Sequence, residues 1–254
     1  AAKAHYFRGR LEESDGNWEA AIDAYQQVQP GDEFIVAVSR LIELQRQHKD
    51  LSSARQTLDQ LRQRFPDQEL RLYLVESDLL FQQKEWQQGH RLLSEALMPH
   101  PDEPNLLYAR SLFSERLKNL NWVEQDLRNI LRQDPDNAMA LNALGYSLAI
   151  MTDRLTEARE LVAKALANKP EDPAILDSFG WIAYRQGELA TARDYLERAY
   201  AQSKDHEIAA HLGEVLWKSG EQDRAKAVWK EGLEHPPDSH IIGETLQRLQ
   251  VKGL

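Results

Sequence analysis

Small and apolar residues in this chain follow the period of an α-helix and also return at a longer interval of 33–35 residues. In the best-formed units the first helix carries apolar residues at i, i+3 and i+7, as at Leu141, Leu144 and Leu148. A period of about 34 residues combined with helical patterning predicts stacked helical hairpins rather than one globular core. The series consists of Ala21, Ala54, Gly89, Ala158, Ala192 and Ala225, with Glu124 where one more small residue is expected.

Glycines recur at two places in several of the units. A glycine inside the first helix predicts close approach of its partner helix, because any side chain there would hold the two helices apart. A second glycine seven residues later predicts a left-handed residue that ends the helix. These two places are occupied by Gly9 and Gly16, Gly180 and Gly187, and Gly213 and Gly220, and Gly145 stands at the first of them.

Prolines mark the ends of many units, since proline just after a helix prevents its continuation. They are Pro30, Pro66, Pro101, Pro135, Pro170 and Pro237. The pair Asp172-Pro173 predicts a helix start, with the aspartate as cap and the proline in the first turn. We predict seven units, at residues 2–35, 36–68, 69–103, 104–137, 138–172, 173–205 and 206–238, followed by a capping helix at 239–250.

The composition narrows the class of partner. The formal net charge is −10, and no cluster of lysine and arginine offsets it, so nucleic acid and anionic membrane surfaces are not expected to bind directly. The absence of cysteine excludes disulfides and thiolate chemistry. No apolar run reaches the length of about 20 residues that spans a bilayer. Because the chain begins within a repeat and without a signal peptide, we expect a fragment or a processed form.

No catalytic, metal or cofactor site is predicted. His206 and His211 stand at i and i+5, so on a helix their side chains diverge, unlike the i, i+4 histidines of zinc proteases. The many carboxylates lie mostly in loops and at helix starts, where the helix dipole stabilises their negative charge. No nucleophile elbow, phosphate-binding loop or dinucleotide fingerprint occurs. The sequence therefore predicts a protein that is not an enzyme.

These repeats resemble the tetratricopeptide repeat, whose pattern is W-x2-L-G-x2-Y, then A-x3-F-x2-A, then proline. The resemblance covers nearly the whole chain and is best in the last three units. The second and fourth units depart from it, with Glu124 in place of the small residue of the fourth. The resemblance implies an all-α fold, a single right-handed superhelical solenoid over residues 1–254.

In this family the first helices of the pairs line a concave groove that binds other proteins. The residues beside the packing glycine and one turn later point into that groove. In the well-formed units the resemblance implies Asn142, Tyr146, Asp177, Trp181, Tyr184, Arg185, His211, Glu214, Trp217 and Lys218 as groove residues. In the weaker units it implies Asp78, Phe81, Tyr108, Glu115 and Arg116.

Four of these side chains form an aromatic series with charges between them. Tyr146, Trp181, Tyr184 and Trp217 belong to consecutive first helices, and aromatic residues beside arginine are typical anchors of protein interfaces. The alternative is that they fill the space between adjacent first helices. The pattern leaves both interpretations open for each residue.

Residues 138–250 resemble, more narrowly, the C-terminal part of proteobacterial tetratricopeptide lipoproteins, through Leu141–Leu148, Asp172–Trp181 and Ala209–Trp217. That resemblance implies a periplasmic protein, anchored to the outer membrane by a lipid that lies outside this chain. It also implies an adaptor that brings a carboxyl-terminal processing protease together with cell-wall hydrolases. The alternatives are an assembly factor for an envelope secretion or pilus complex, an enzyme with an unrecognised site, and a cytoplasmic location.

Overall fold

The computed structural model describes residues 2–234 and 239–253, and this part of the chain forms fifteen α-helices, one short 3-10 helix and no strand. The predicted all-α class is confirmed. The chain forms two compact units, Ala1–Asn119 and Leu120–Leu254. The predicted handedness and the prediction of one uninterrupted solenoid remain predictions.

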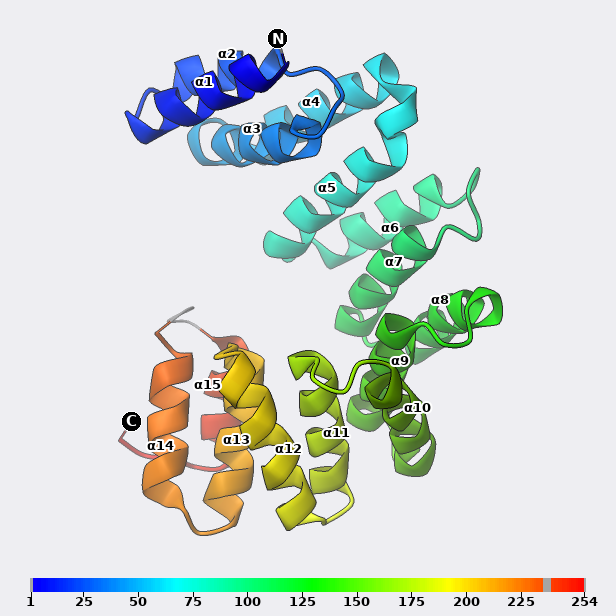
Figure 1. Cartoon of the computed structure of the whole chain (residues 1–254), viewed down its shortest axis with the longest axis vertical. Coiled ribbons are helices and arrows are strands. Elements are labelled where there is room, and N and C mark those ends of the chain that lie inside the picture. The colour runs from blue at the N-terminus through cyan, green and yellow to red at the C-terminus, as the bar shows by residue number, and fades with distance from the viewer. Residues whose placement is uncertain (1, 235–238, 254) are drawn as a thin grey trace. The chain divides into compact units, whose positions relative to one another are not determined.

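The first unit contains seven α-helices that form successive antiparallel neighbours (Figure 1). They are α1 (Ala2–Ser14), α2 (Trp18–Gln26), α3 (Phe34–His48), α4 (Leu51–Arg64), α5 (Glu69–Gln82), α6 (Trp86–Ala96) and α7 (Pro104–Arg116), and the 3-10 helix Pro66–Gln68 precedes α5. Two helices fall in each of the first three predicted repeats, although α3 begins two residues ahead of the predicted boundary.

The second unit begins with α8, the second helix of the fourth predicted repeat, and continues in regular pairs (Figure 1). Its helices are α8 (Leu120–Gln133), α9 (Ala138–Met151), α10 (Leu155–Asn168), α11 (Pro173–Arg185), α12 (Leu189–Gln202), α13 (His206–Lys218), α14 (Gln222–Gly232) and α15 (His240–Arg248). The predicted closing residue of the last pair, Pro237, lies outside the described residues.

Most second helices bury residues at i, i+4 and i+7, with the small-residue series at the first position, and in α4 the third of these, Leu61, is half-buried. The helix α8 corrects the predicted register. Val123, Leu127 and Ile130 are its buried residues at this spacing, whereas Glu124 forms ion pairs with Arg128 and Arg154. The prediction that Glu124 occupies the packing position was therefore wrong by one residue, because a fully buried valine takes that position.

The glycines of the first helices lie where the partner helix passes closest. A Cβ atom at Gly213 would come within 2.1 Å of Trp229 Nε1, and one at Gly180 within 2.7 Å of Leu196 Cγ. The second set of glycines has positive φ, 84° at Gly187 and 86° at Gly220, as predicted for residues that end a helix. In the third repeat the same place is taken by Lys84, at φ 58°.

Helix starts and inter-repeat contacts follow local chemistry. Asp172 Oδ1 accepts hydrogen bonds from the backbone amides of Ala174 and Ile175, which confirms the predicted cap. Each of four buried alanines is followed by a basic residue, which bonds to a group at the start of the next second helix or, for the last, to the C-terminal segment. These contacts are Arg55 to Gln88, Arg159 to Glu188, Arg193 to Glu221, and Lys226 to the carbonyl oxygen of Lys252.

None of the described helices is both long and apolar enough to cross a membrane.

Candidate protein-binding surface

The first helices α9, α11 and α13, together with α15, form a row in the second unit, and side chains connect each helix to the next. Glycines on three of them face the second helices of the same pairs, Gly145 toward Val162, Gly180 toward Leu196 and Gly213 toward Trp229. With those sides occupied, the remaining polar and aromatic side chains meet those of neighbouring first helices. We call this row of connected side chains the inner face.

A buried ion pair lies at its centre. The imidazole Nδ1 of His211 on α13 lies 3.0 Å from each carboxylate oxygen of Asp177 on α11. Exposure of the two side chains is only 5% and 7%. Burial acts to lower the pKa of His211, but the charge and hydrogen bond of Asp177 outweigh it, so the pKa is raised above its ordinary value. The imidazole and the carboxylate thus hold each other in place between α11 and α13.

The indole of Trp181 covers this pair. Its ring stacks on the imidazole of His211, with centroids 4.1 Å apart and planes inclined by 19°. The Tyr184 ring lies 5.0 Å from the same indole on the neighbouring turn. The rotamer of Trp181 is therefore fixed by contacts from two helices, since His211 itself is held by Asp177.

A second buried carboxylate, Glu214, joins three helices. Arg248 of α15 binds both of its oxygens at 2.6 Å, and the hydroxyl of Tyr184 donates to Oε1 at 2.9 Å. Burial, followed by the charge and hydrogen bond of Glu214, raises the pKa of Tyr184. A bidentate arginine on a buried carboxylate is a directional contact that fixes α15 against α13.

Two further contacts connect α9 to its neighbours. The hydroxyl of Tyr146 donates to Glu207 Oε1 of α13 at 2.8 Å and so reaches past α11. Arg185 of α11 donates to the carbonyl oxygen of Ala149 and lies 3.3 Å from Asp153 Oδ1. Side chains thus fill much of the space between the first helices.

The structure separates the ten predicted groove residues by burial. Lys218 is exposed, while Asn142, Tyr146, Trp181, Tyr184, Arg185 and Trp217 are half-buried. Asp177, His211 and Glu214 are buried, so the prediction that they project into an open groove was wrong. The reason is that ion pairs with neighbouring helices draw them inward. For all ten residues a role in partner binding stays a prediction.

Two of the aromatic residues differ in what they contact. Trp217 packs toward Trp229 of its own second helix, with ring centroids 5.8 Å apart. Trp181 instead stacks on a polar pair between two first helices. Its indole Nε1 is buried without a hydrogen-bond partner, as is the side-chain oxygen of Asn142. The inner face therefore holds an unused donor and an unused acceptor.

The residues predicted in the weaker repeats do not form a comparable surface. Phe81 packs edge-on against Trp86 and Phe113 of the first unit, and Arg116 lies over its ring at 5.6 Å. Phe81 is thus part of the helix packing rather than a groove residue. Asp78 and Arg116 are exposed, and Tyr108 and Glu115 are half-buried.

Sequence reasoning missed two members of the inner face, Glu207 and Arg248. A signal for one of them existed, because Arg248 follows Glu214 by 34 residues, the same offset that separates His211 from Asp177. Opposite charges that stand one repeat apart on first helices therefore indicate contacts between neighbouring repeats. Glu207 carried no such signal, since its partner Tyr146 lies two repeats away.

The histidines singled out as a possible metal motif have separate partners. His206 Nδ1 lies 2.9 Å from the hydroxyl of Ser239, whereas His211 pairs with Asp177. Within residues 2–234 and 239–253, no group of three or more histidine, aspartate and glutamate side chains is arranged to hold a metal ion.

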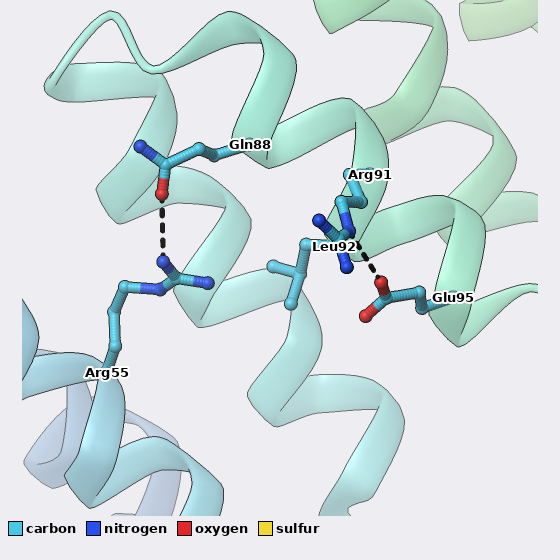
Figure 2. Close-up of a pocket in the computed structure, with 5 residues that line it drawn as sticks. All are labelled: Arg55, Gln88, Arg91, Leu92 and Glu95. Atoms are coloured by element: carbon cyan, nitrogen blue, oxygen red, sulfur yellow. Dashed lines mark hydrogen bonds and ion pairs between the residues drawn. The ribbon is translucent and has the colours of Figure 1, made fainter.

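A hollow of about 210 Å³ lies in the first unit between α4 and α6, lined by Arg55, Gln88, Arg91, Leu92 and Glu95 (Figure 2). Its charged groups bind one another. Arg55 bonds to Gln88 at 2.9 Å and to the buried Glu76 at 2.7 Å, and Arg91 pairs with Glu95 at 2.9 Å. The hollow is small and its arginines are paired, so the inner face of the second unit remains the candidate surface.

Comparison with known proteins identifies the repeat. A family model described as tetratricopeptide repeat matches residues 1–34, 124–173 and 178–231, and a second model of the same description matches residues 38–67. A TPR repeat-containing protein of Pseudomonas aeruginosa is 46% identical over 211 residues, which is 83% of this chain. The matched part spans 36% of the length of that relative.

Solved structures agree on the fold. A tetratricopeptide repeat protein from Parabacteroides merdae superposes with a TM-score of 0.73 at 16% identity, covering 98% of this chain and 99% of that one. PilW, described as a widely conserved type IV pilus biogenesis factor, gives a TM-score of 0.62 at 16% identity, covering 85% and 100%. At such identities these likenesses concern the fold alone.

Proposed function

This chain belongs to the tetratricopeptide repeat family, whose members act as protein-interaction scaffolds, and we propose that it binds a protein partner on the inner face of α9, α11 and α13. The observation that carries the proposal is the fixed indole of Trp181, stacked on the buried His211–Asp177 pair. A scaffold of this kind supplies shape and contacts rather than catalysis.

The stacked indole supports binding because a side chain that is already ordered loses little conformational entropy when a partner covers it. Aromatic residues and arginine dominate the energetics of protein interfaces when they are buried by the partner. Trp181 offers such an aromatic surface, and Arg185 lies one turn further along the same helix.

The charge of the chain suggests the chemistry of the partner. With a net charge of −10, the scaffold attracts basic surfaces and disfavours acidic ones. We therefore propose that the bound segment presents apolar side chains for Trp181 and Tyr184, with basic residues beside them.

The narrower role that we propose is that of an adaptor, which brings a carboxyl-terminal processing protease together with its protein substrates, among them cell-wall hydrolases. It would act in the periplasm, held at the outer membrane by a lipid elsewhere in the longer protein. This role is supported by the resemblance of residues 138–250 to lipoprotein adaptors. The second candidate, an assembly factor for a pilus or secretion complex, shares with PilW only the fold.

Capture from a bacterial envelope extract tests the adaptor role. The immobilised protein is compared with Trp181→Ala and with a matched control, Trp122→Ala, whose indole lies on the second helix α8 and is 42% exposed. We expect the wild type and the control to retain a processing protease, and Trp181→Ala to lose it. Recovery of pilus or secretin components instead would favour assembly. Recovery of neither class would contradict both roles.

A further inference from the structure

The first helix of the chain exposes positions that its counterparts bury. On α1, Ala4 is exposed, Phe7 is 58% exposed and Leu11 is 61% exposed. The third, sixth and tenth residues of α11 are Ile175, Ser178 and Ile182, exposed by 3%, 4% and 0%. The same places on α13 are Ile208, His211 and Val215, exposed by 5%, 4% and 0%. The same three positions are thus exposed on α1 and buried on α11 and α13.

The difference depends on which side of the helix is covered. On α1 the opposite side carries Gly9, whose Cβ position lies 2.5 Å from Tyr25 of α2, just as Gly180 of α11 faces Leu196 of α12. The other side of α11 is covered by the preceding helices α9 and α10, which both pack against it. Ala4, Phe7 and Leu11 therefore form an apolar stripe where a preceding second helix would lie.

The last helix has the opposite character. Gly243 and Gln247 of α15 stand at the places of the fully or nearly fully buried Ala209 and Gly213 of α13, yet both are exposed. The position of Gly243 faces open space. A first helix that exposes glycine and glutamine where its own second helix would pack has the polar outer surface of a terminal cap. The first helix, with Phe7 and Leu11 outward, does not have such a surface.

We propose that the stripe Ala4, Phe7 and Leu11 is the docking face for a further helix of the same polypeptide, one that precedes α1 and packs on it as α10 packs on α11. Two observations select this occupant. The equivalent helices α11 and α13 each pack against the second helix of the preceding pair, α10 and α12, and this chain spans only 36% of the length of its Pseudomonas relative.

A second copy stacked end to end fits poorly. Its C-terminal end presents α15, a first helix with Gln247 and Gly243 outward, and would place polar groups against Phe7 and Leu11. This inference is independent of which protein the inner face binds.

Cysteine labelling tests the proposal, because residues 1–254 contain no cysteine. Leu11→Cys is prepared in residues 1–254 and in the polypeptide as its gene encodes it, with any cysteine outside these residues replaced by serine. Ala190→Cys, at an exposed position of α12, is the matched control. The rate of reaction with a water-soluble maleimide is measured for each variant.

We expect the thiol at position 11 to react at least tenfold more slowly in the encoded polypeptide than in residues 1–254, with equal rates in both forms at position 190. Equal rates at position 11 in both forms would overturn the proposal. Protection within residues 1–254 that grows with protein concentration would also overturn it, because a second copy would then cover the stripe.

Discussion

His211 and Asp177 face each other across neighbouring first helices, with Nδ1 3.0 Å from both carboxylate oxygens and each side chain more than nine-tenths buried. The indole of Trp181 closes over the imidazole at 4.1 Å. One ion pair therefore connects the packing of α11 and α13 to the orientation of the side chain that we propose as the main anchor for a partner.

Replacing Asp177 with alanine leaves the imidazole of His211 buried without its carboxylate. Removing one partner of a buried pair is strongly destabilising, so we expect a loss of about 3 kcal/mol in the free energy of unfolding. Asp153→Ala is the matched control, because this carboxylate is 99% exposed and its ion pair is with the half-buried Arg185 at 3.3 Å. Urea denaturation followed by circular dichroism measures both. A loss as small for Asp177→Ala as for the control would mean that the pair contributes little.

The raised pKa of His211 predicts how this contribution varies with pH. A histidine whose folded-state pKa lies above the unfolded value of about 6.5 stabilises fully below that pH, and its stabilisation is lost as the pH rises through the folded-state pKa. The difference in unfolding free energy between wild type and the non-titrating His211→Gln should therefore shrink on the alkaline side of about pH 6.5. An NMR titration that places the pKa of His211 below the unfolded value would contradict this.

The close approach at Gly213 predicts an overpacking effect. An added methyl group would lie 2.1 Å from Trp229 Nε1, and the buried indole has little room to move. We expect Gly213→Ala to destabilise by about 1–3 kcal/mol. Gly243→Ala, on α15 where the Cβ position is open, is the control and should be neutral or stabilising by up to about 1 kcal/mol. Equal melting temperatures for the two variants would contradict the close approach of Trp229 to Gly213.

Lys84 occupies a left-handed conformation at φ 58°, at the place where three other repeats have Gly16, Gly187 and Gly220. A side chain is strained in this region, so Lys84→Gly should stabilise the first unit by about 0.5–1 kcal/mol. The reverse change, Gly187→Lys at φ 84°, should destabilise by about 1 kcal/mol. Differential scanning calorimetry gives both shifts. Destabilisation by Lys84→Gly would mean that the lysine makes a contact worth more than its strain.

The fold was largely predictable because the same types of residue recur at the packing positions of successive repeats. Gly180 and Gly213 mark the close crossings, and Gly187 and Gly220 mark the helix ends. The fourth repeat was misread at Glu124, since a rule based on small residues cannot anticipate that Val123 fills the same place.

The site was less predictable, because burial depends on partners from other repeats. Asp177 and Glu214 read as groove residues by position, but His211 and Arg248 draw them inward. The position of a residue on a helix gives the direction of its side chain. Whether a charged side chain is exposed or paired depends on the residues of the neighbouring repeat.

The most direct test of the account is the affinity of a purified processing protease for wild type, Trp181→Ala and the control Trp122→Ala, measured by isothermal titration calorimetry with helicity checked by circular dichroism. Truncation of an interface anchor costs about 2 kcal/mol, which corresponds to a loss of about 30-fold in affinity. The account predicts this loss for Trp181→Ala alone, with the helical signal retained. Wild-type affinity in a folded Trp181→Ala protein would contradict the claim that the inner face binds the partner.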